Sequence, residues 1–479
     1  MATITSTGVG SGLDVESIVT QLMAVERRPL SLLESEKSSL NAKISSFGKI
    51  QSQLAELRDK ASALASPTLW KQTVGTSSDD TAVSVTAGTE AVAGSYAVSV
   101  SGLAAAQTAV SSAFASSSSQ LNEGTLTIDV GTWTGSPTPT GFTASVAPPI
   151  SVPIIAGETS LEAIRDKINA ANSGVTASII NDAGGARLAI RSKATGLESA
   201  FRIRVSETVD DGNAATGLSA LSYDPAGGAA QLTRTTAAAN ATARINGIDI
   251  SSASNTLTNV VDGLSLTLKK VTGAQTVDLT VVSDTESVKK AVQEFATAFN
   301  ALAGHLQNET KYNADAKKAS TLQGDRTAVS LQGQLRALLN ESFTGSSAFS
   351  RLSDIGLVMK SDGTLETKSA KLDAALGNLP ELKKLFGATG NTTAETGFME
   401  RYRALADRLL GTDGAIDSRT KGLQASVTRN SRRQDAVQQR LEETEARLRK
   451  QYQSLDTNMA KLGGLSNYVN QMVNSLNRS

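Results

Sequence analysis

The strongest constraint on the fold is a seven-residue apolar repeat near each end of the chain. Toward the carboxy terminus, every seventh residue is aliphatic, at Leu441, Leu448, Leu455, Leu462, Val469 and Leu476. Near the amino terminus the same step runs through Leu33, Leu40, Phe47, Leu54 and Ala61. Such a repeat makes a narrow apolar seam along a helix, and another helix with a similar seam is needed to bury it. We therefore predict that both ends are helical assembly surfaces.

The amino-terminal helix is expected over residues 13–65, with an interruption at Pro29. Its first part carries one apolar stripe, formed by Leu13, Ile18, Leu22 and Val25. Ser11 and Asp14 are expected to form a capping box at its start. We assign Leu22 and Val25 to oligomerisation and partner docking, together with Leu33, Leu40, Phe47 and all six residues of the carboxy-terminal seam.

Burial of the carboxy-terminal seam does not by itself keep the outer ends of the chain folded. Six seam residues at roughly 2 kcal/mol each contribute about 12 kcal/mol in a complete interface. Ordering several dozen residues costs roughly 1 kcal/mol or more for each of them, and helical hydrogen bonds offset only part of this cost. We expect the outer termini, including residues 440–479, to be frayed or disordered in a free monomer and to become ordered on assembly.

The middle of the chain, from about Thr73 to Asp284, has the period-two alternation of β-strands. The alternating apolar sets are Val83 and Val85; Tyr96, Val98 and Val100; Leu126, Ile128 and Val130; Phe201, Ile203 and Val205; Leu264, Leu266 and Leu268; and Val277, Leu279 and Val281. An amphipathic helix is predicted over residues 161–171, with Thr159 and Glu162 as its capping box. Strands at 175–180 and 188–191 follow, joined by a turn at 181–185.

Helical periodicity returns near Thr285. The expected core-facing stripe consists of Val288, Val292, Phe295, Phe299, Leu302 and Leu306. Further helices are predicted over 327–340, 369–376 and 394–410 and from about Asp417 to the end, with a hairpin over 355–367 turning at Asp362-Gly363. Gly463 and Gly464 are expected to weaken or kink the last helix, because glycine costs about 1 kcal/mol in a helix interior.

The chain is therefore an α+β multidomain protein, with helical coiled-coil termini, a helical-bundle domain and two β-rich domains inserted in the middle. The expected segments are a first leg helix (1–40), a helical-domain segment (41–72), the first part of a β domain (73–112), an inserted outer β domain (113–232), the second part of the β domain (233–284), a helical bundle (285–430) and a second leg (431–479). A length of 479 residues suits about three or four domains.

Composition and motifs argue against an enzyme. The chain has no cysteine and a single histidine, His305, so thiolate chemistry and two-histidine metal sites are excluded. Gly8-Val9-Gly10-Ser11-Gly12 resembles a dinucleotide loop, but Leu13 and the short polar stretch before it do not fit the fingerprint. A half-buried or solvated role is favoured for His305. We predict no cofactor and no catalytic or metal-binding residue.

Charge and hydropathy limit the partners. Lysine and arginine together number 46, as do aspartate and glutamate, so nucleic acid is not an expected partner. The pairs Asp79-Asp80 and Asp210-Asp211 fit solvated turns better than a calcium site. In the charge-dense segment 432–450, Glu443 and Glu445 stand four residues before Arg447 and Arg449, as on the solvated flank of a coiled coil. No apolar run suits a cleaved signal peptide or membrane insertion.

Three segments resemble one known family, the bacterial flagellar filament cap proteins, also called flagellar hook-associated protein 2. The first is the leader from Gly8 to Asp14 with the following residues 18–23 and 26–30. The second is residues 355–376, including Asp362-Gly363-Thr364-Leu365. The third, residues 156–201, is similar to the flagellin hook IN motif of several axial flagellar proteins.

Membership of this family would imply a closed homo-oligomeric ring at the distal filament tip, for which five copies are favoured over four or six. The cap would promote polymerisation of exported flagellin and prevent its leakage, which filament elongation and motility require. Its partners would be itself, flagellin, the hook-filament junction proteins and an export chaperone before secretion. The resemblance also implies secretion through the flagellar type III export channel to the extracellular flagellum tip.

Two alternatives stay open at this point. The first is another axial flagellar structural protein, either a flagellin or a hook-filament junction protein, which would polymerise without closing into a ring. The second is a tip adhesin, because loops rich in threonine and serine would be exposed there for cell adhesion.

Overall fold

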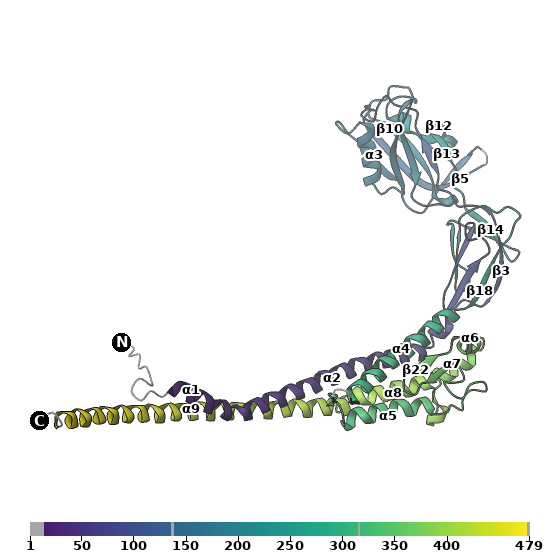
Figure 1. Cartoon of the computed structure of the whole chain (residues 1–479). Helices are drawn as coiled ribbons and strands as arrows, with labels where there is room; N and C mark the ends of the chain where they lie inside the picture. Colours follow the sequence, from purple (N-terminus) through teal and green to yellow (C-terminus); the bar gives the residue numbers. More distant parts are fainter. Residues whose placement is uncertain (1–13, 136–137, 315–316, 477–479) are drawn as a thin grey trace. The chain divides into compact units, whose positions relative to one another are not determined.

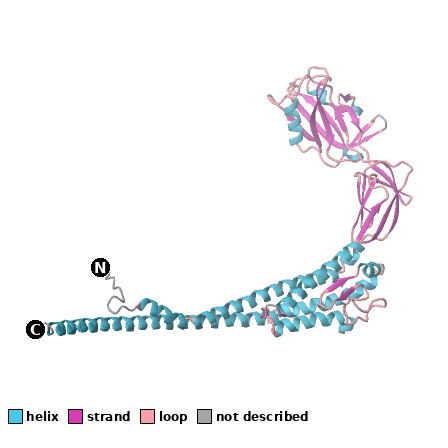
Figure 2. Cartoon of the chain, viewed as in Figure 1, coloured by secondary structure: helices cyan, strands magenta, loops and turns pink. Residues whose placement is uncertain are grey.

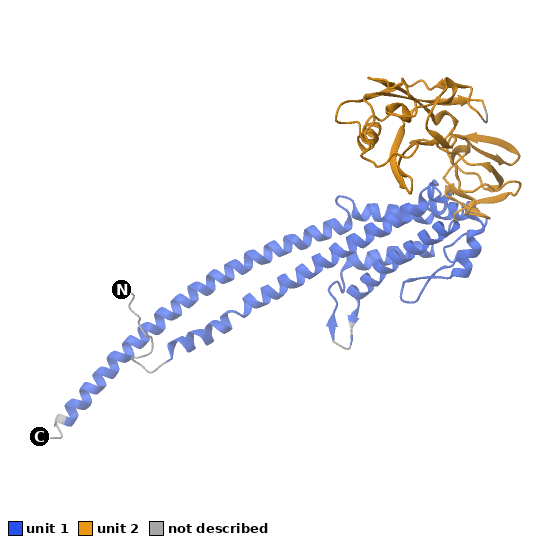
Figure 3. Ribbon diagram, turned by 90° about the horizontal axis from the view of Figure 1, so that it is seen from above, with its two compact units in different colours: residues 1–70, 285–479 blue, residues 71–284 orange. Residues whose placement is uncertain are grey.

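The computed structural model describes residues 14–135, 138–314 and 317–476 (Figure 1). Helices form both ends of the chain, and strands form most of its middle (Figure 2). This arrangement confirms the α+β class. The chain divides into two compact units, of which unit 1 comprises residues 1–70 and 285–479 and unit 2 comprises residues 71–284 (Figure 3). The predicted seven-segment division stays a prediction.

The amino-terminal part of unit 1 contains two helices, α1 (Val15–Glu26) and α2 (Arg28–Ala65). The Asp14 carboxylate caps α1 by accepting a hydrogen bond from the backbone N–H of Ser17 at 2.9 Å. Ser11, the predicted partner of Asp14, lies outside the described residues. Pro29 stands in the first turn of α2, where its missing N–H leaves no helical hydrogen bond unmade.

The carboxy-terminal helix α9 (Ala415–Leu476) is 62 residues long, so it extends for about 90 Å at 1.5 Å per residue. It continues through Gly463 and Gly464 without a break in the helix. The two glycines therefore do not end the helix, and the expectation that they weaken or kink it stays a prediction.

The rest of unit 1 is a helical bundle with small hairpins. Its elements are α4 (Thr285–Thr310), β19 (Tyr312–Asn313), β20 (Lys318–Ala319), α5 (Arg326–Asn340), β21 (Leu357–Met359), β22 (Leu365–Thr367), α6 (Ser369–Leu376), α7 (Leu379–Gly387) and α8 (Phe398–Leu410). All six residues of the predicted α4 stripe are buried. Phe295 and Phe299 pack against Tyr402 of α8 at ring separations of 5.3 and 6.1 Å. The core of unit 1 forms around these rings.

Two details of this bundle differ from the sequence expectation. Helix α7 was not predicted, although Pro380 in its first turn and the spacing of Leu382, Leu385 and Phe386 are helical signals. Helix α8 begins at Phe398, and not at Ala394, because a separate turn precedes it. In that turn Thr392 and Glu395 form a capping box.

Unit 2 contains two β-cores, and the first consists of antiparallel sheets of five and three strands. The five-stranded sheet has the order β1 (Thr73–Ser77), β18 (Val277–Ser283), β3 (Gly94–Gly102), β14 (Ala241–Ile245), β15 (Ile248–Ser252). The three-stranded sheet has the order β16 (Thr256–Val261), β17 (Leu264–Leu268), β2 (Val83–Ala87). Alternate residues of β3, β17 and β18 fill this core, as their sequence pattern predicts.

The buried apolar residues of the second β-core lie between Ala109 and Leu232. One sheet has the order β12 (Ala229–Ala230), β11 (Tyr223–Asp224), β10 (Ala200–Glu207), β5 (Gly124–Thr134), β6 (Gly141–Ala144), and β7 (Ile150–Ile154) also pairs with β5. The other has the order β13 (Thr233–Thr236), β4 (Thr108–Val110), β9 (Gly185–Ser192), β8 (Val175–Asp182). This separate core supports the predicted insertion, whose boundaries stay a prediction.

The predicted helix of this second core is α3 (Leu161–Ala170), and its apolar face is buried as expected at Leu161, Ile164 and Ile168. The predicted cap at Thr159 is wrong. Ser160 is the N-cap, and its hydroxyl accepts a hydrogen bond from the backbone N–H of Ala163 at 3.2 Å. The Thr159 hydroxyl instead donates to the side chain of Gln120.

Candidate functional site

The candidate site is the pair of terminal helices of unit 1, where α1 packs on α9. Val15, Val19 and Met23 of α1 are buried against Leu441, and Leu448 and Tyr452 are partly buried beside them. The three α1 residues recur every four positions, so they lie on one face of the helix. This face was missed in the sequence, although the Val15, Val19, Met23 spacing could have revealed it.

The predicted α1 stripe lies on another side of the helix. Leu22 and Val25 are 40% and 57% exposed, so they do not hold α1 on α9, and Ile18 is only half-buried. Leu13 lies outside the described residues. Leu22 and Val25 therefore do not contribute to the contact between α1 and α9, and their assignment to oligomerisation and filament docking stays a prediction.

Ion pairs flank the apolar contact between α1 and α9. The Arg449 guanidinium donates to both carboxylate oxygens of Glu16, at 2.6 and 2.9 Å. It also donates to Glu445 at 3.0 Å, which confirms that predicted i to i+4 pair. The hydrogen bond from Arg449 lowers the pKa of Glu16, and the two carboxylates together raise the pKa of Arg449. We call Glu16, Glu445 and Arg449 the α1 clamp.

Docking of α1 should weaken in acid because of this clamp. The pKa of Glu16 is lowered from 4.5 in the folded chain, so its contribution is complete above pH 4.5 and is lost as the pH falls through the lowered pKa. A spin label on a cysteine at Gln21, an exposed position in a chain without cysteine, should gain mobility on acidification.

The matched control for this prediction is Glu16→Gln, which removes the titrating carboxylate. The label should already be more mobile in this variant at pH 7, and its mobility should change less between pH 6 and pH 3. Equal pH profiles for the two proteins would contradict a role for the clamp.

Along α2, the predicted amino-terminal seam runs from the surface into the core. Leu33 and Leu40 are half-buried, whereas Phe47 is 1% exposed and packs in the main core of unit 1 together with Leu54 and Ala61. The Phe47 side chain is therefore unavailable to a partner, and its assignment to docking is corrected to a core role. The sequence could not separate these roles, because the same seven-residue step continues through both.

Beyond Tyr452, α9 keeps its apolar repeat but exposes it. The yellow end of α9 extends past α1 in Figure 1. Its large exposed apolar side chains are Leu455, Met459, Leu462, Leu465, Tyr468, Val469, Met472 and Val473. They are spaced mostly by three and four residues, so they share one side of the helix. We call this set the distal face. Residues 462–476 include no charged residue, and the side chain of Leu476 lies outside the described residues.

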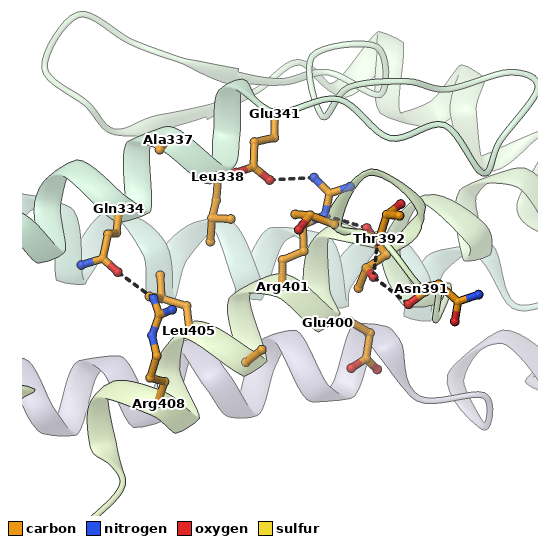
Figure 4. Close-up of a pocket in the computed structure, with 14 residues that line it drawn as sticks. Gln334, Ala337, Leu338, Glu341, Asn391, Thr392, Glu400, Arg401, Leu405 and Arg408 are labelled. Atoms are coloured by element: carbon orange, nitrogen blue, oxygen red, sulfur yellow. Dashed lines mark hydrogen bonds and ion pairs between the residues drawn. The ribbon is translucent and has the colours of Figure 1, made fainter. Parts of the chain in front are cut away.

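A pocket of about 520 Å³ lies between α5, α8 and residues 390–396 (Figure 4). Its buried Arg401 donates hydrogen bonds to the carboxylate of Glu341 at 2.9 Å and to the carbonyl oxygens of Thr396 and Ser342. Arg408 on the rim donates to Gln334 at 2.8 Å. Arg401 therefore ties three segments together, which is a structural role.

The remaining chemical candidates offer little. His305 is half-buried on α4 beside the core residues Leu302 and Leu306. Glu207, Asp210 and Asp211 lie close enough to share a cation, but hydrogen bonds within their own loops already engage these carboxylates. The glycine-rich leader at residues 8–12 lies outside the described residues. No described helix has the length and apolar character needed to cross a membrane.

Comparison with known families gives matches along most of the chain. The profile of the flagellar hook-associated protein 2 N-terminus matches residues 11–107, and that of its C-terminus matches residues 238–463. The flagellin hook IN motif matches residues 125–194. These matches include α1, α2, most of α9 and part of the second β-core, from β5 to β9.

Individual relatives agree with these profiles. The flagellar hook-associated protein 2 of Escherichia coli strain K12 is 33% identical over 98% of each chain. That of Salmonella typhimurium strain LT2 is 32% identical over 100% of each chain. The crystal structure of the flagellar cap protein FliD D1-D2-D3 domains from Escherichia coli has a TM-score of 0.59 and 31% identity, and covers 79% of this chain and 99% of that chain.

Proposed function

This chain belongs to the flagellar hook-associated protein 2 family, and from that premise we propose that it caps the distal tip of the bacterial flagellar filament. The cap promotes the polymerisation of flagellin and keeps flagellin from escaping. The similar FliD structure is titled a flagellar cap protein, and the relatives match over nearly their whole length. Full-length matches to hook-associated protein 2 favour this family over the flagellin and junction-protein alternatives.

The observation that carries the proposal is the exposed distal face of α9. Eight large apolar side chains on one side of a helix are an assembly surface, because exposure of such a patch to water is unfavourable. We propose that Leu455, Leu462 and Val469 dock on other copies or on the filament, with Leu22 and Val25 as secondary contacts. Leu441 and Leu448 act indirectly, because they hold α1 in place.

The proposed partners follow from this role. They are further copies in a closed ring, with five copies favoured, and flagellin together with the hook-filament junction proteins below the ring. An export chaperone covers the chain before secretion through the flagellar type III channel. We propose no enzymatic activity, because Arg401 and Glu341, the paired charges of the pocket between α5 and α8, are engaged in structural contacts. Cell adhesion stays a separate prediction.

Deletion of the gene tests the proposal directly. Cells without the protein should release flagellin monomers into the medium and lack filaments, and the wild-type gene should restore both filaments and swimming. Electron microscopy of filament tips and immunoblots of the medium are the measurements. Normal filaments in the deletion strain would overturn the proposal.

Hydrogen exchange should divide α9 into two parts near Tyr452. In a monomer verified by light scattering, amides before Tyr452 should be protected by contact with α1. Amides of residues 455–476 should exchange fast, because isolated helical stretches are marginal in water. Assembly should slow exchange in the second part. The expectation of fraying over residues 440–479 is thereby corrected to start after Tyr452, because Leu441 and Leu448 pack on α1. Full protection of residues 455–476 in the monomer would contradict it.

A further inference from the structure

Side-chain amides replace a strand partner at several positions in this chain. In each case, two hydrogen bonds join one asparagine side chain to the backbone of one other residue. The amide oxygen accepts a hydrogen bond from the N–H of that residue, and the amide nitrogen donates one to its carbonyl oxygen. The pairs are Asn169 with Ala177, Asn255 with Ala104, and Asn300 with Leu365. We call this two-bond contact an amide clip. It satisfies both backbone groups of one residue, as a neighbouring strand would do.

The clip made by Asn169 lies on a sheet edge. Asn169 is in the last turn of α3, and Ala177 is in β8, the terminal strand of the order β13, β4, β9, β8. The Ala177 N–H donates to the Asn169 side chain at 2.8 Å, and the Asn169 side chain donates to the Ala177 carbonyl at 2.9 Å. Asn169 therefore occupies the place that a further strand would take.

The pairing of β8 with β9 shows which backbone groups face this edge. Ala177, Ile179 and Asn181 are opposite Ile190, Leu188 and Ala186 of β9. The backbone groups of Leu188 and Ala186 bond to residues 111 and 114, on the side of β9 away from β8. These are therefore non-hydrogen-bonded pairs, in which the two facing residues point their backbone groups away from each other. The backbone groups of Ile179 and Asn181 therefore point outward, as those of Ala177 do.

Most of this edge lacks the charged residues and prolines that discourage pairing with another chain. Residues 175–181 contain no charged residue and no proline, and Ile180 is 50% exposed. These residues form a continuous strand of about 20 Å at 3.3 Å per residue, long enough to pair. Charge, proline or a covering segment normally protects such an edge. Here the clip at Ala177 breaks the row of available backbone groups.

We propose that Asn169 closes the β8 edge against antiparallel pairing with β8 of a second copy. A second copy is the fitting occupant, because an antiparallel pair of identical strands around a two-fold axis is self-complementary. Apart from Asp182, which pairs with Arg187 of its own chain, the side chains of β8 are neutral and add no repulsion. The clip thus leaves assembly to the helical surfaces. The inference does not depend on the proposed capping function, because it concerns only the edge of one sheet.

Cross-linking can test this closure in the full-length chain, which has no native cysteine. Cysteine at Ile180, with a short bis-maleimide, reports a second β8 edge nearby. Asn169→Ala in this background should raise the yield of covalent dimer, and the dissociation constant for this contact should fall about tenfold or more, since each added backbone hydrogen bond has a modest net value. Asn169→Leu, which keeps the side-chain volume, should act in the same way.

Two controls make the result specific. Asn255→Ala removes a clip that lies away from β8 and should not raise cross-linking at Ile180. Cysteine at Ile248, an exposed position on β15, should give the same yield with and without Asn169. Unchanged Ile180 cross-linking in both Asn169 variants, with circular dichroism like that of the parent protein, would overturn the proposal. If one variant fails to fold, the other decides the question. A rise confined to Ile180 would support it even if ring formation is normal.

Discussion

Glutamate at both Leu455 and Leu462 is expected to abolish ring assembly and swimming while the monomer keeps its fold. The two side chains are 44% and 62% exposed, so their replacement should change the free energy of unfolding by no more than about 0.5 kcal/mol. In an assembled interface, each carboxylate would be buried without a partner, at a cost of several kcal/mol. Two such costs in every copy are enough to prevent assembly at micromolar concentration.

The opposite side of α9 supplies a matched control. Asn467→Glu and Gln471→Glu add the same two charges to positions that are exposed and away from the distal face. This variant should form rings and support swimming, as judged by electron microscopy and motility plates. Normal swimming with both leucines replaced would show that the distal face does not dock. Equal defects in the two variants would point to net charge as the cause.

The largest loss of stability is expected from Phe295→Ala in unit 1. The Phe295 side chain is fully buried and contacts the rings of Phe299 and Tyr402. Its removal leaves a cavity that rigid neighbours cannot fill, and a truncation of this kind costs about 3–5 kcal/mol. Urea unfolding followed by helical circular dichroism should show the shift, because unit 1 holds nearly all of the helix.

Two comparisons make this measurement specific to the core. Phe295→Leu fills most of the cavity and should lose markedly less stability. The intrinsic fluorescence of Trp133 reports on unit 2, in which Trp133 packs on Phe142 and Tyr223, and its transition should be unchanged by Phe295→Ala. Trp70→Phe in both proteins removes the other tryptophan of the chain. A loss under 1 kcal/mol would contradict the tight packing described here.

The sequence predicts the element types well where one periodicity persists. The six residues of the α4 stripe and the alternating residues of β17 and β18 are buried as predicted, as are Val98 and Val100 of β3, because one face of each element packs on a core. Tyr96 of β3 is half-buried. Short elements were harder to find. Helix α7 was missed because its nine residues give only two turns of pattern, too few to stand out from a loop.

The candidate site was predicted only in part, because a repeat does not reveal its partner. Leu441 and Leu462 belong to the same seam, yet Leu441 is 6% exposed and Leu462 is 62% exposed. Their exposure differs because Leu441 packs against α1, whereas Leu462 lies beyond the end of α1. Where α1 ends along α9 is determined by the three-dimensional fold. The Glu16 to Arg449 pair joins residues far apart in sequence, so no local spacing could have predicted it.

The division of the chain also determines the order in which its parts can be completed. Unit 2 is built from one uninterrupted stretch, residues 71–284, whereas unit 1 needs residues from both sides of it. When such a chain is synthesised or released gradually from either end, all residues of unit 2 are therefore available before the last residues of unit 1. The β-rich part can fold early, and the helical part is completed last, when the two distant ends finally meet.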